Sequence, residues 1–202
     1  MLISHKYKFI FIKTRKTAGT SIEVDLSQLM GPEDVVTPVN PPEEGHKPRN
    51  HQGFYPHMPA NEVRKRIGRQ VFNSYYKFCV ERDPVEKCIS YYFFHTRSDN
   101  RVELGSWEHF VNSDKLPVDE KLYTDRFGRL LVDRIVPYHD LNVQLPILLQ
   151  GLGVPFDGVR ARAKSGFREQ IEVSHQERDQ IMKKFKKTAQ ILALEEQRRA
   201  QK

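Results

Sequence analysis

The chain has 202 residues, of which 38% are hydrophobic and 29% are charged. That composition is typical of a globular protein with its own core, and it excludes a low-complexity or collagen-like chain. The formal net charge of +7 favours anionic partners but does not distinguish a small anion from a nucleic acid. No apolar run is long enough to cross a membrane and no apolar leader is evident, so we expect a cytoplasmic protein. We find neither a repeat nor a linker, and we predict one domain over residues 1–202.

A buried strand is predicted over residues 9–12, followed by a loop and by a helix that begins near Ser21. The connecting segment, residues 14–21, reads Thr-Arg-Lys-Thr-Ala-Gly-Thr-Ser. A helix N-terminus attracts anions through its N–H groups and its dipole, and Gly19 lets the backbone come close to a ligand. Lys16 adds a flexible positive charge. The segment therefore predicts a site for a phosphate-like anion, and the alternative is a simple turn between a strand and a helix.

The order of residues in this loop differs from that of a Walker A loop. The Walker A pattern, GxxxxGK[ST], places a glycine directly before the lysine and a hydroxyl residue directly after it. Here Lys16 precedes the only glycine of the segment, Gly19, by three residues. The Mg²⁺-binding arrangement of a nucleotide kinase is therefore not specified.

Residues 31–57 are rich in proline, glycine and charge, and we predict a long functional loop there. The loop contains His46, His51 and His57, and a short helix over residues 58–67 is expected to follow. Histidine suits general-base chemistry because its pKa lies near neutral pH. The alternative for His57 is packing or capping near the helix start.

A second junction of this kind is predicted further along the chain. Residues 76–80 read as a buried strand, and Pro84 suits the first position of a helix over residues 85–94. Arg82 lies at the strand end and Ser90 follows about two helical turns later, so a guanidinium and a hydroxyl group can converge on one phosphate. The alternative is an Arg–Asp turn pair with a serine that faces solvent.

The second half of the chain carries fewer functional signals. In chain order we predict strand material over 129–136, a helix over 141–152, a basic stretch over 160–168 and an amphipathic C-terminal helix over 174–199. Ser174 and Glu177 have the spacing of a capping box for that last helix. Cys79 and Cys88 fall in a predicted strand and helix, so we expect reduced, buried thiols, and no Cys/His spacing resembles a zinc site.

Taken together, the two junctions resemble those of the PAPS-dependent sulfotransferases, PAPS being 3′-phosphoadenosine 5′-phosphosulfate. In that family a first strand–loop–helix holds the 5′-phosphosulfate, and a later R-[DN]-P-x(5)-S-Y pattern holds the 3′-phosphate. The chain has Lys-Thr-Ala-Gly-Thr-Ser at 16–21 and matches the second pattern at 82–91. The motifs are most similar to those of the branch with the uronosyl 2-O-sulfotransferases and their bacterial relatives. Arg15 stands where many relatives have proline.

The resemblance implies an α/β fold of three layers, with a central, mostly parallel sheet and a P-loop NTPase-like strand–loop–helix for the phosphosulfate. It implies sulfuryl transfer from PAPS to a hydroxyl or amine acceptor, release of 3′,5′-ADP and no required metal. In the resembling branch a histidine before the helix that precedes the 3′-phosphate strand is the base, which matches His57 first and His51 second. Glu62 and Glu23 are weaker candidates. Lys16 would stabilise negative charge on the leaving phosphate.

The residues that the resemblance assigns to PAPS are Arg15, Lys16, Thr17, Ala18, Gly19, Thr20, Ser21, Arg82, Ser90, Lys164, Ser165 and Arg168. From the residues alone, two rival functions stay open. A P-loop nucleotide kinase or NTPase would depend on ATP and Mg²⁺, and a noncatalytic nucleic-acid or polyanion-binding protein would show a steep salt dependence. The aromatic residues do not cluster with the basic ones, which argues against a nucleic-acid stacking platform. A saccharide, a lipid, a peptide tyrosine and a small natural product all stay open as acceptors.

Overall fold

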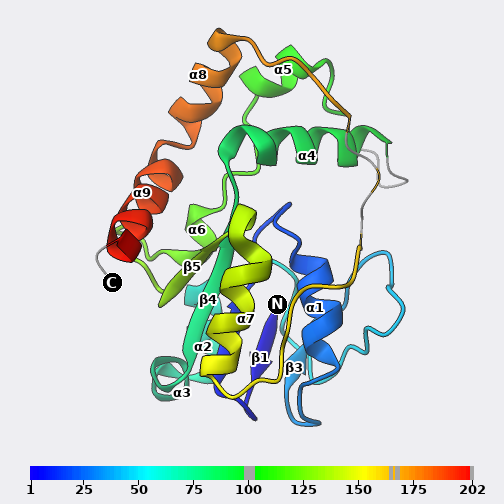
Figure 1. Cartoon of the computed structure of the whole chain (residues 1–202), viewed down its shortest axis with the longest axis vertical. Helices are drawn as coiled ribbons and strands as arrows, with labels where there is room; N and C mark the ends of the chain where they lie inside the picture. Colours follow the sequence, from blue (N-terminus) through cyan, green and yellow to red (C-terminus); the bar gives the residue numbers. More distant parts are fainter. Residues whose placement is uncertain (98–102, 164–165, 167–168, 201–202) are drawn as a thin grey trace. The chain divides into compact units, whose positions relative to one another are not determined.

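The computed structural model describes residues 1–97, 103–163, 166 and 169–200, and the chain forms two compact units (Figure 1). Unit 1 comprises Met1–Glu81 and Lys121–Ala163, and unit 2 comprises Arg82–Glu120 and Lys164–Lys202. Each unit has its own hydrophobic cluster. That the two units fold together as the one domain expected over residues 1–202 stays a prediction.

Unit 1 is built on a five-stranded sheet with the strand order β3-β1-β2-β4-β5. The strands are β1 (Leu2–Ser4), β2 (Phe9–Ile12), β3 (Val35–Val36), β4 (Tyr76–Glu81) and β5 (Arg134–Pro137). β2, β4 and β5 are parallel, whereas β1 is antiparallel to both β2 and β3. The sheet is therefore mixed, and only its β2-β4-β5 part fits the mostly parallel arrangement that we expected. The connection from β1 to β2 is too short for a crossover, so these two strands pair as a hairpin.

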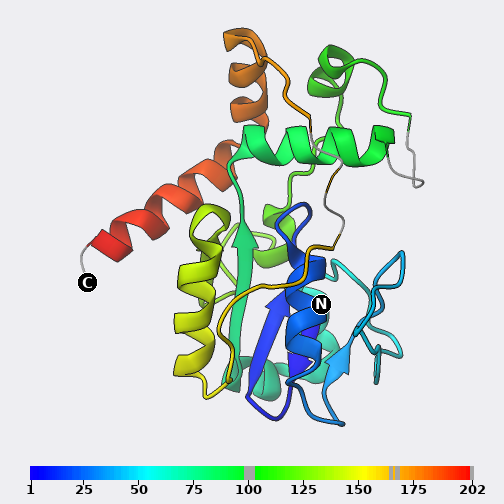
Figure 2. The ribbon, with the colours of Figure 1, turned by 45° about the vertical axis from the view of Figure 1, so that its right-hand side comes forward.

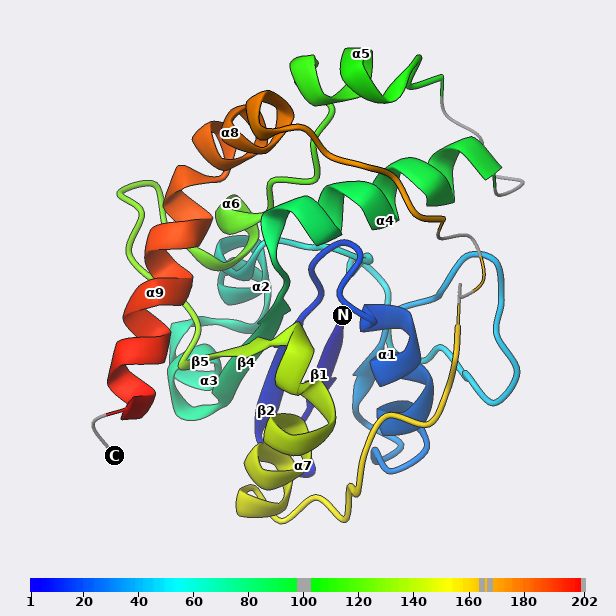
Figure 3. The ribbon, with the colours of Figure 1, turned by 45° about the horizontal axis from the view of Figure 1, so that its top comes forward.

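Helices cover both faces of this sheet (Figure 3). On one face, α1 (Gly19–Ser27) and α7 (Leu141–Gly151) pack on alternate strand residues such as Phe11, Phe78 and Val136. On the other face lie α2 (Ala60–Ile67) and α3 (Arg69–Ser74). The strand side chains alternate between the two helical layers because successive residues of a strand point to opposite faces.

The remaining elements of the sheet region are short. They are α6 (Glu120–Tyr123), whose residues from Lys121 on belong to unit 1, and the 3₁₀ turn η1 (Tyr138–Asp140). The strand material predicted over 129–136 is only partly a strand, because β5 begins at Arg134. Leu130 instead forms an isolated bridge with Thr124, across a turn at Asp125 to Arg129.

Unit 2 is helical. Its helices are α4 (Pro84–Arg97), α5 (Trp107–Asn112), α8 (His175–Lys184) and α9 (Lys186–Ala200). Aromatic and aliphatic side chains fill the unit's core, among them Phe93, Trp107 and Phe110. Within it, Lys87 Nζ and Asp119 Oδ2 form a fully buried ion pair at 2.9 Å.

The single helix that we predicted over 174–199 is two helices, α8 and α9, which run in different directions (Figure 2). The helix is interrupted at Phe185, where φ is −94° and ψ is 14°. The side chain of Phe185 is fully buried in the core of unit 2 beside Ile181, so core packing decides where the chain bends. The predicted capping box of Ser174 and Glu177 is present at the start of α8.

No described helix is both long and apolar enough to cross a lipid bilayer. Both cysteines are free and buried, as the sequence predicted.

Because both thiols are buried, we expect neither to react in the native protein. Burial raises the pKa of the Cys88 thiol to about 12, so the reactive thiolate is scarce there, and Cys79 is fully buried in β4. A chromogenic disulfide reagent at about pH 8 should label the native protein slowly and label two thiols per chain in urea. Fast labelling without denaturant would contradict this burial.

Candidate active site

The loop between β2 and α1 occupies the place that the sequence predicted for an anion site. The helix begins at Gly19, two residues before the predicted start. Ala18, the residue before the helix, has φ 59°, and Lys16 has φ 57°, so both adopt the left-handed conformation. The N-cap residue Ala18 provides no side-chain hydrogen bond to α1, so the first-turn N–H groups and the helix dipole favour a bound anion.

Two threonine hydroxyl groups hold this loop against the end of β4. Thr14 Oγ1 donates to the carbonyl oxygen of Val80, and the hydroxyl groups of Thr14 and Thr17 are 2.8 Å apart. Both side chains are buried. Thr17, a predicted nucleotide ligand, thus uses its hydroxyl group within the loop.

A buried ion pair that sequence reasoning did not detect lies beneath the loop. Lys13 directly follows β2, and its Nζ pairs with Glu23 Oε2 of α1. Neither side chain is more than 6% exposed. Glu23, one of the weaker candidates for the base, is thus engaged by a cation in the protein interior. The only hint of this pair in the sequence is a lysine at the end of an apolar strand and a glutamate on the adjacent helix.

His57 contacts the same loop. Its Nδ1 lies 3.0 Å from the carbonyl oxygen of Lys13. A carbonyl group only accepts hydrogen bonds, so the neutral ring carries its proton on Nδ1 and has its basic lone pair on Nε2. His57 is half-buried and has φ 60°, a left-handed conformation that turns the chain just before α2.

The other base candidates have different surroundings. His51 lies in a tight turn, where its carbonyl oxygen accepts from the N–H of Phe54 at 2.8 Å. Glu62, on α2, accepts from the hydroxyl group of Tyr55 at 2.6 Å, and this bond raises the pKa of Tyr55. Of these candidates, Glu23 pairs with the Lys13 side chain, and His57 hydrogen-bonds the Lys13 backbone carbonyl group.

The basic stretch predicted over 160–168 lies partly beside α1. The N–H groups of Arg160 and Ala161 donate to Asp25 at 2.7 and 3.0 Å, and Ala163 N–H donates to Ser21 Oγ at 3.1 Å. This segment therefore reaches the first turn of α1. Lys164, Ser165 and Arg168 lie outside the described residues.

The second motif lies in unit 2, and the structure shows what each of its residues does locally. Asp83 Oδ1 accepts from the N–H of Glu86 at 2.9 Å and so caps α4, which begins at Pro84. The buried Arg82 donates through Nη2 to Glu86 Oε2 at 3.2 Å. Ser90 is half-buried in α4, in the turn after Glu86. Asp83 was not among the predicted site residues, and the sequence signal for this cap is an aspartate directly before the proline that begins the helix.

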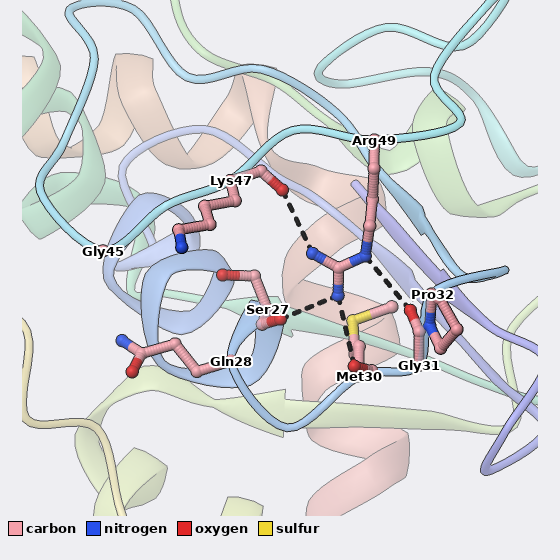
Figure 4. A pocket seen from close by; sticks show the side chains of 8 residues that line it. All are labelled: Ser27, Gln28, Met30, Gly31, Pro32, Gly45, Lys47 and Arg49. Atoms are coloured by element: carbon pink, nitrogen blue, oxygen red, sulfur yellow. Dashed lines mark hydrogen bonds between the residues drawn. The ribbon is translucent and has the colours of Figure 1, made fainter.

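A pocket of about 470 Å³ lies at the other end of α1 (Figure 4). Its lining residues are Ser27, Gln28, Met30, Gly31, Pro32, Gly45, Lys47 and Arg49. The guanidinium group of Arg49 donates to the carbonyl oxygens of Ser27 at 2.8 Å, Gly31 and Lys47 at 3.1 Å, and Met30 at 3.3 Å. Arg49 therefore satisfies carbonyl groups at the C-terminal end of α1, where the helix leaves them without partners. None of the residues assigned to PAPS lines this pocket.

Within the described part of the chain, no three His, Cys, Asp or Glu side chains are grouped so as to hold a metal ion.

Together, the sheet with helices on both faces and the loop at the start of α1 define an α/β protein with a strand–loop–helix whose geometry suits an anion. A family model described as "Sulfotransferase family" matches residues 1–141. The chain therefore belongs to the sulfotransferase family, whose members transfer a sulfuryl group from a donor to an acceptor. It is also 33% identical over 102 residues to an uncharacterized protein of Archaeoglobus fulgidus, a match that covers 48% of this chain and 84% of the relative.

His46, the third histidine of the long loop, hydrogen-bonds to the backbone. Its Nε2 donates to the carbonyl oxygen of Thr37 at 2.9 Å, and no described group hydrogen-bonds its buried Nδ1. Burial lowers the pKa of His46 from its ordinary value of 6.5, with a smaller opposing effect of the Thr37 carbonyl.

This environment predicts a loss of stability on acidification. As the pH falls below 6.5, the unfolded chain takes up a proton at His46 that the folded chain resists, so the free energy of unfolding falls. His46→Gln keeps a donor for Thr37 but does not titrate. Thermal melts between about pH 7.5 and 5.5 should therefore show a smaller loss of Tm for the variant than for the wild type. Equal losses would contradict the neutral, partly buried state of His46.

Proposed function

We propose that the protein transfers the sulfuryl group of PAPS to a hydroxyl or amine acceptor and releases 3′,5′-ADP. The hydrogen bond from His57 to the Lys13 carbonyl carries this proposal, because it joins a proton acceptor to the loop that suits a phosphosulfate. Membership of the sulfotransferase family supports the reaction class.

In the proposed reaction, His57 Nε2 takes the proton of the acceptor hydroxyl group as its oxygen attacks sulfur. A bond forms between the acceptor oxygen and sulfur, and the bond from sulfur to the bridging oxygen of the phosphosulfate breaks. The electron pair of that bond stays on the phosphate of 3′,5′-ADP. Lys16 and the first-turn N–H groups of α1 stabilise the charge that develops there. The transfer is in line and direct, without a covalent enzyme intermediate.

Arg82 and Ser90 are the proposed ligands of the 3′-phosphate. A guanidinium group offers two parallel donors to a phosphate, and Ser90 adds a hydroxyl donor. In the structure the guanidinium group of Arg82 pairs with Glu86 Oε2 at 3.2 Å. Lys164, Ser165 and Arg168 are proposed nucleotide contacts on the resemblance alone.

Nucleotide binding tests this proposal first. By calorimetry, we expect the wild type to prefer 3′,5′-ADP over ATP with Mg²⁺. Arg82→Ala should weaken 3′,5′-ADP binding by about tenfold or more, since a charge-assisted hydrogen bond contributes about 1.5–3 kcal/mol. Arg129→Ala is the matched control, because it removes the same charge from an exposed turn where Arg129 pairs with Asp125.

A preference for ATP with Mg²⁺ would favour a nucleotide kinase or NTPase instead. Salt-sensitive DNA or RNA binding without a nucleotide preference would favour a polyanion-binding protein.

The base assignment has its own test. With an acceptor found by screening against labelled PAPS, His57→Ala should lower kcat by about 10²–10⁴-fold, the usual contribution of a general base. Binding of 3′,5′-ADP should persist in this variant, which separates loss of the base from loss of the fold. If His51→Ala loses the activity while His57→Ala retains it, His51 is the base.

A further inference from the structure

We infer that Lys13 and Glu23 are positioning residues for His57. Their buried ion pair holds the Lys13 carbonyl group where it accepts the Nδ1 proton of the ring, and so selects the tautomer with a basic Nε2. The catalytic meaning of this inference rests on the proposed function, whereas the state of the ring is a property of the chain itself.

The Lys13 side chain runs beneath the first turn of α1. A methyl group added at Gly19 would lie only 2.8 Å from Lys13 Cγ and 3.2 Å from Lys13 Cε. The aliphatic stem is therefore in close contact with the helix backbone, and the ammonium group emerges beside Glu23, one turn further along α1. Such a confined side chain leaves its own backbone little freedom.

Glu23 provides a fixed anchor for the ammonium group. Its side chain is fully buried, and one carboxylate oxygen pairs with Lys13. The other oxygen pairs with the amino group of Met1 and lies 3.4 Å from Thr37 Oγ1. Because a buried carboxylate without partners is costly, the site favours the arrangement in which Lys13 stays in place.

The backbone on either side of Lys13 is also fixed. Ile12, before it, pairs with Cys79 in the sheet, and Thr14, after it, donates to the Val80 carbonyl oxygen. The Lys13 carbonyl group therefore has a defined direction, and it meets His57 Nδ1 at 3.0 Å. An acceptor at Nδ1 is needed because neutral histidine in water favours the tautomer protonated on Nε2.

The ring of His57 can be observed directly. In ¹⁵N-labelled protein at about pH 8.5, about two units above the ordinary pKa of histidine, the imidazole ¹⁵N–¹H correlations report which nitrogen carries the proton. The His57 signals are assigned by their loss in His57→Gln. We expect a protonated Nδ1 in the wild type and a shift toward the Nε2-protonated tautomer in Lys13→Met.

Lys87→Met is the matched control, because it breaks another fully buried lysine–carboxylate pair, with Asp119 in unit 2. It should leave the His57 signals unchanged. If Lys13→Met does not fold, the double variant Lys13→Met/Glu23→Gln removes both charges together and keeps an amide oxygen as an acceptor for the Met1 amino group. A folded variant of either kind that keeps the wild-type tautomer overturns the inference.

Measurements of kcat and of 3′,5′-ADP affinity then distinguish a failure of this inference from a failure of the proposed function. With an acceptor in hand, kcat of the Lys13 variant should fall about tenfold, the lower end of the effect of lost orienting partners, while 3′,5′-ADP affinity stays at the wild-type value. An unchanged kcat would overturn the positioning role. The tautomer could shift as expected while the protein transfers no sulfuryl group. That result would contradict the proposed function but would leave the tautomer assignment of the His57 ring intact.

Discussion

Parallel pairing of β2 with β4 is the constraint from which the candidate active site follows. Ile12 pairs with Cys79, so the carboxyl ends of the two strands meet at the same edge of the sheet. This register brings Thr14 within reach of the Val80 carbonyl oxygen, and that bond fixes the loop that leads into α1. The hydroxyl groups of Thr14 and Thr17 lie on the buried side of this loop. The N-cap residue of α1 provides no side-chain hydrogen bond to the helix that follows the loop. A slip of one residue between these strands would turn the side chains of β2 to the opposite faces and remove this arrangement.

Two separate reasons account for a glycine at Gly19. Its position at the start of α1 lets a ligand approach the backbone, which is the reason that the sequence alone offers. The structure adds a second reason, because the stem of Lys13 occupies the space where a side chain at this position would lie. A Cβ at this position would point into the Lys13 side chain, so packing inside the protein by itself accounts for a glycine here.

Sequence patterns of neighbouring residues predicted those helices and strands that depend mainly on interactions between neighbouring residues. The strands at Phe9–Ile12 and Tyr76–Glu81, the helix at Leu141–Gly151 and the capping box of α8 depend on apolar runs and caps that the sequence displays directly. The antiparallel β1 and the break at Phe185 could not be predicted in this way, since one follows from a hairpin connection and the other from packing in a core formed by distant segments.

The same distinction applies to the site. The sequence identified His57 as a candidate, but its partner is a backbone carbonyl group 44 positions away, which no residue pattern records. Glu23 was only a weaker candidate for the base and Lys13 was not singled out, because burial of a charged pair is visible only once the helix lies on the sheet.

Asp83 shows that a residue of a sequence motif can have a structural role at the start of a helix. Its side chain contributes one oxygen to the N–H of Glu86, and the motif that it belongs to accepts either aspartate or asparagine at this position. The two residues differ in charge but share a side-chain oxygen at the same distance from the backbone. What this position of the motif specifies is therefore a hydrogen-bond acceptor at the start of a helix. Part of the motif thus describes how the helix begins, and only the rest describes how a ligand is bound.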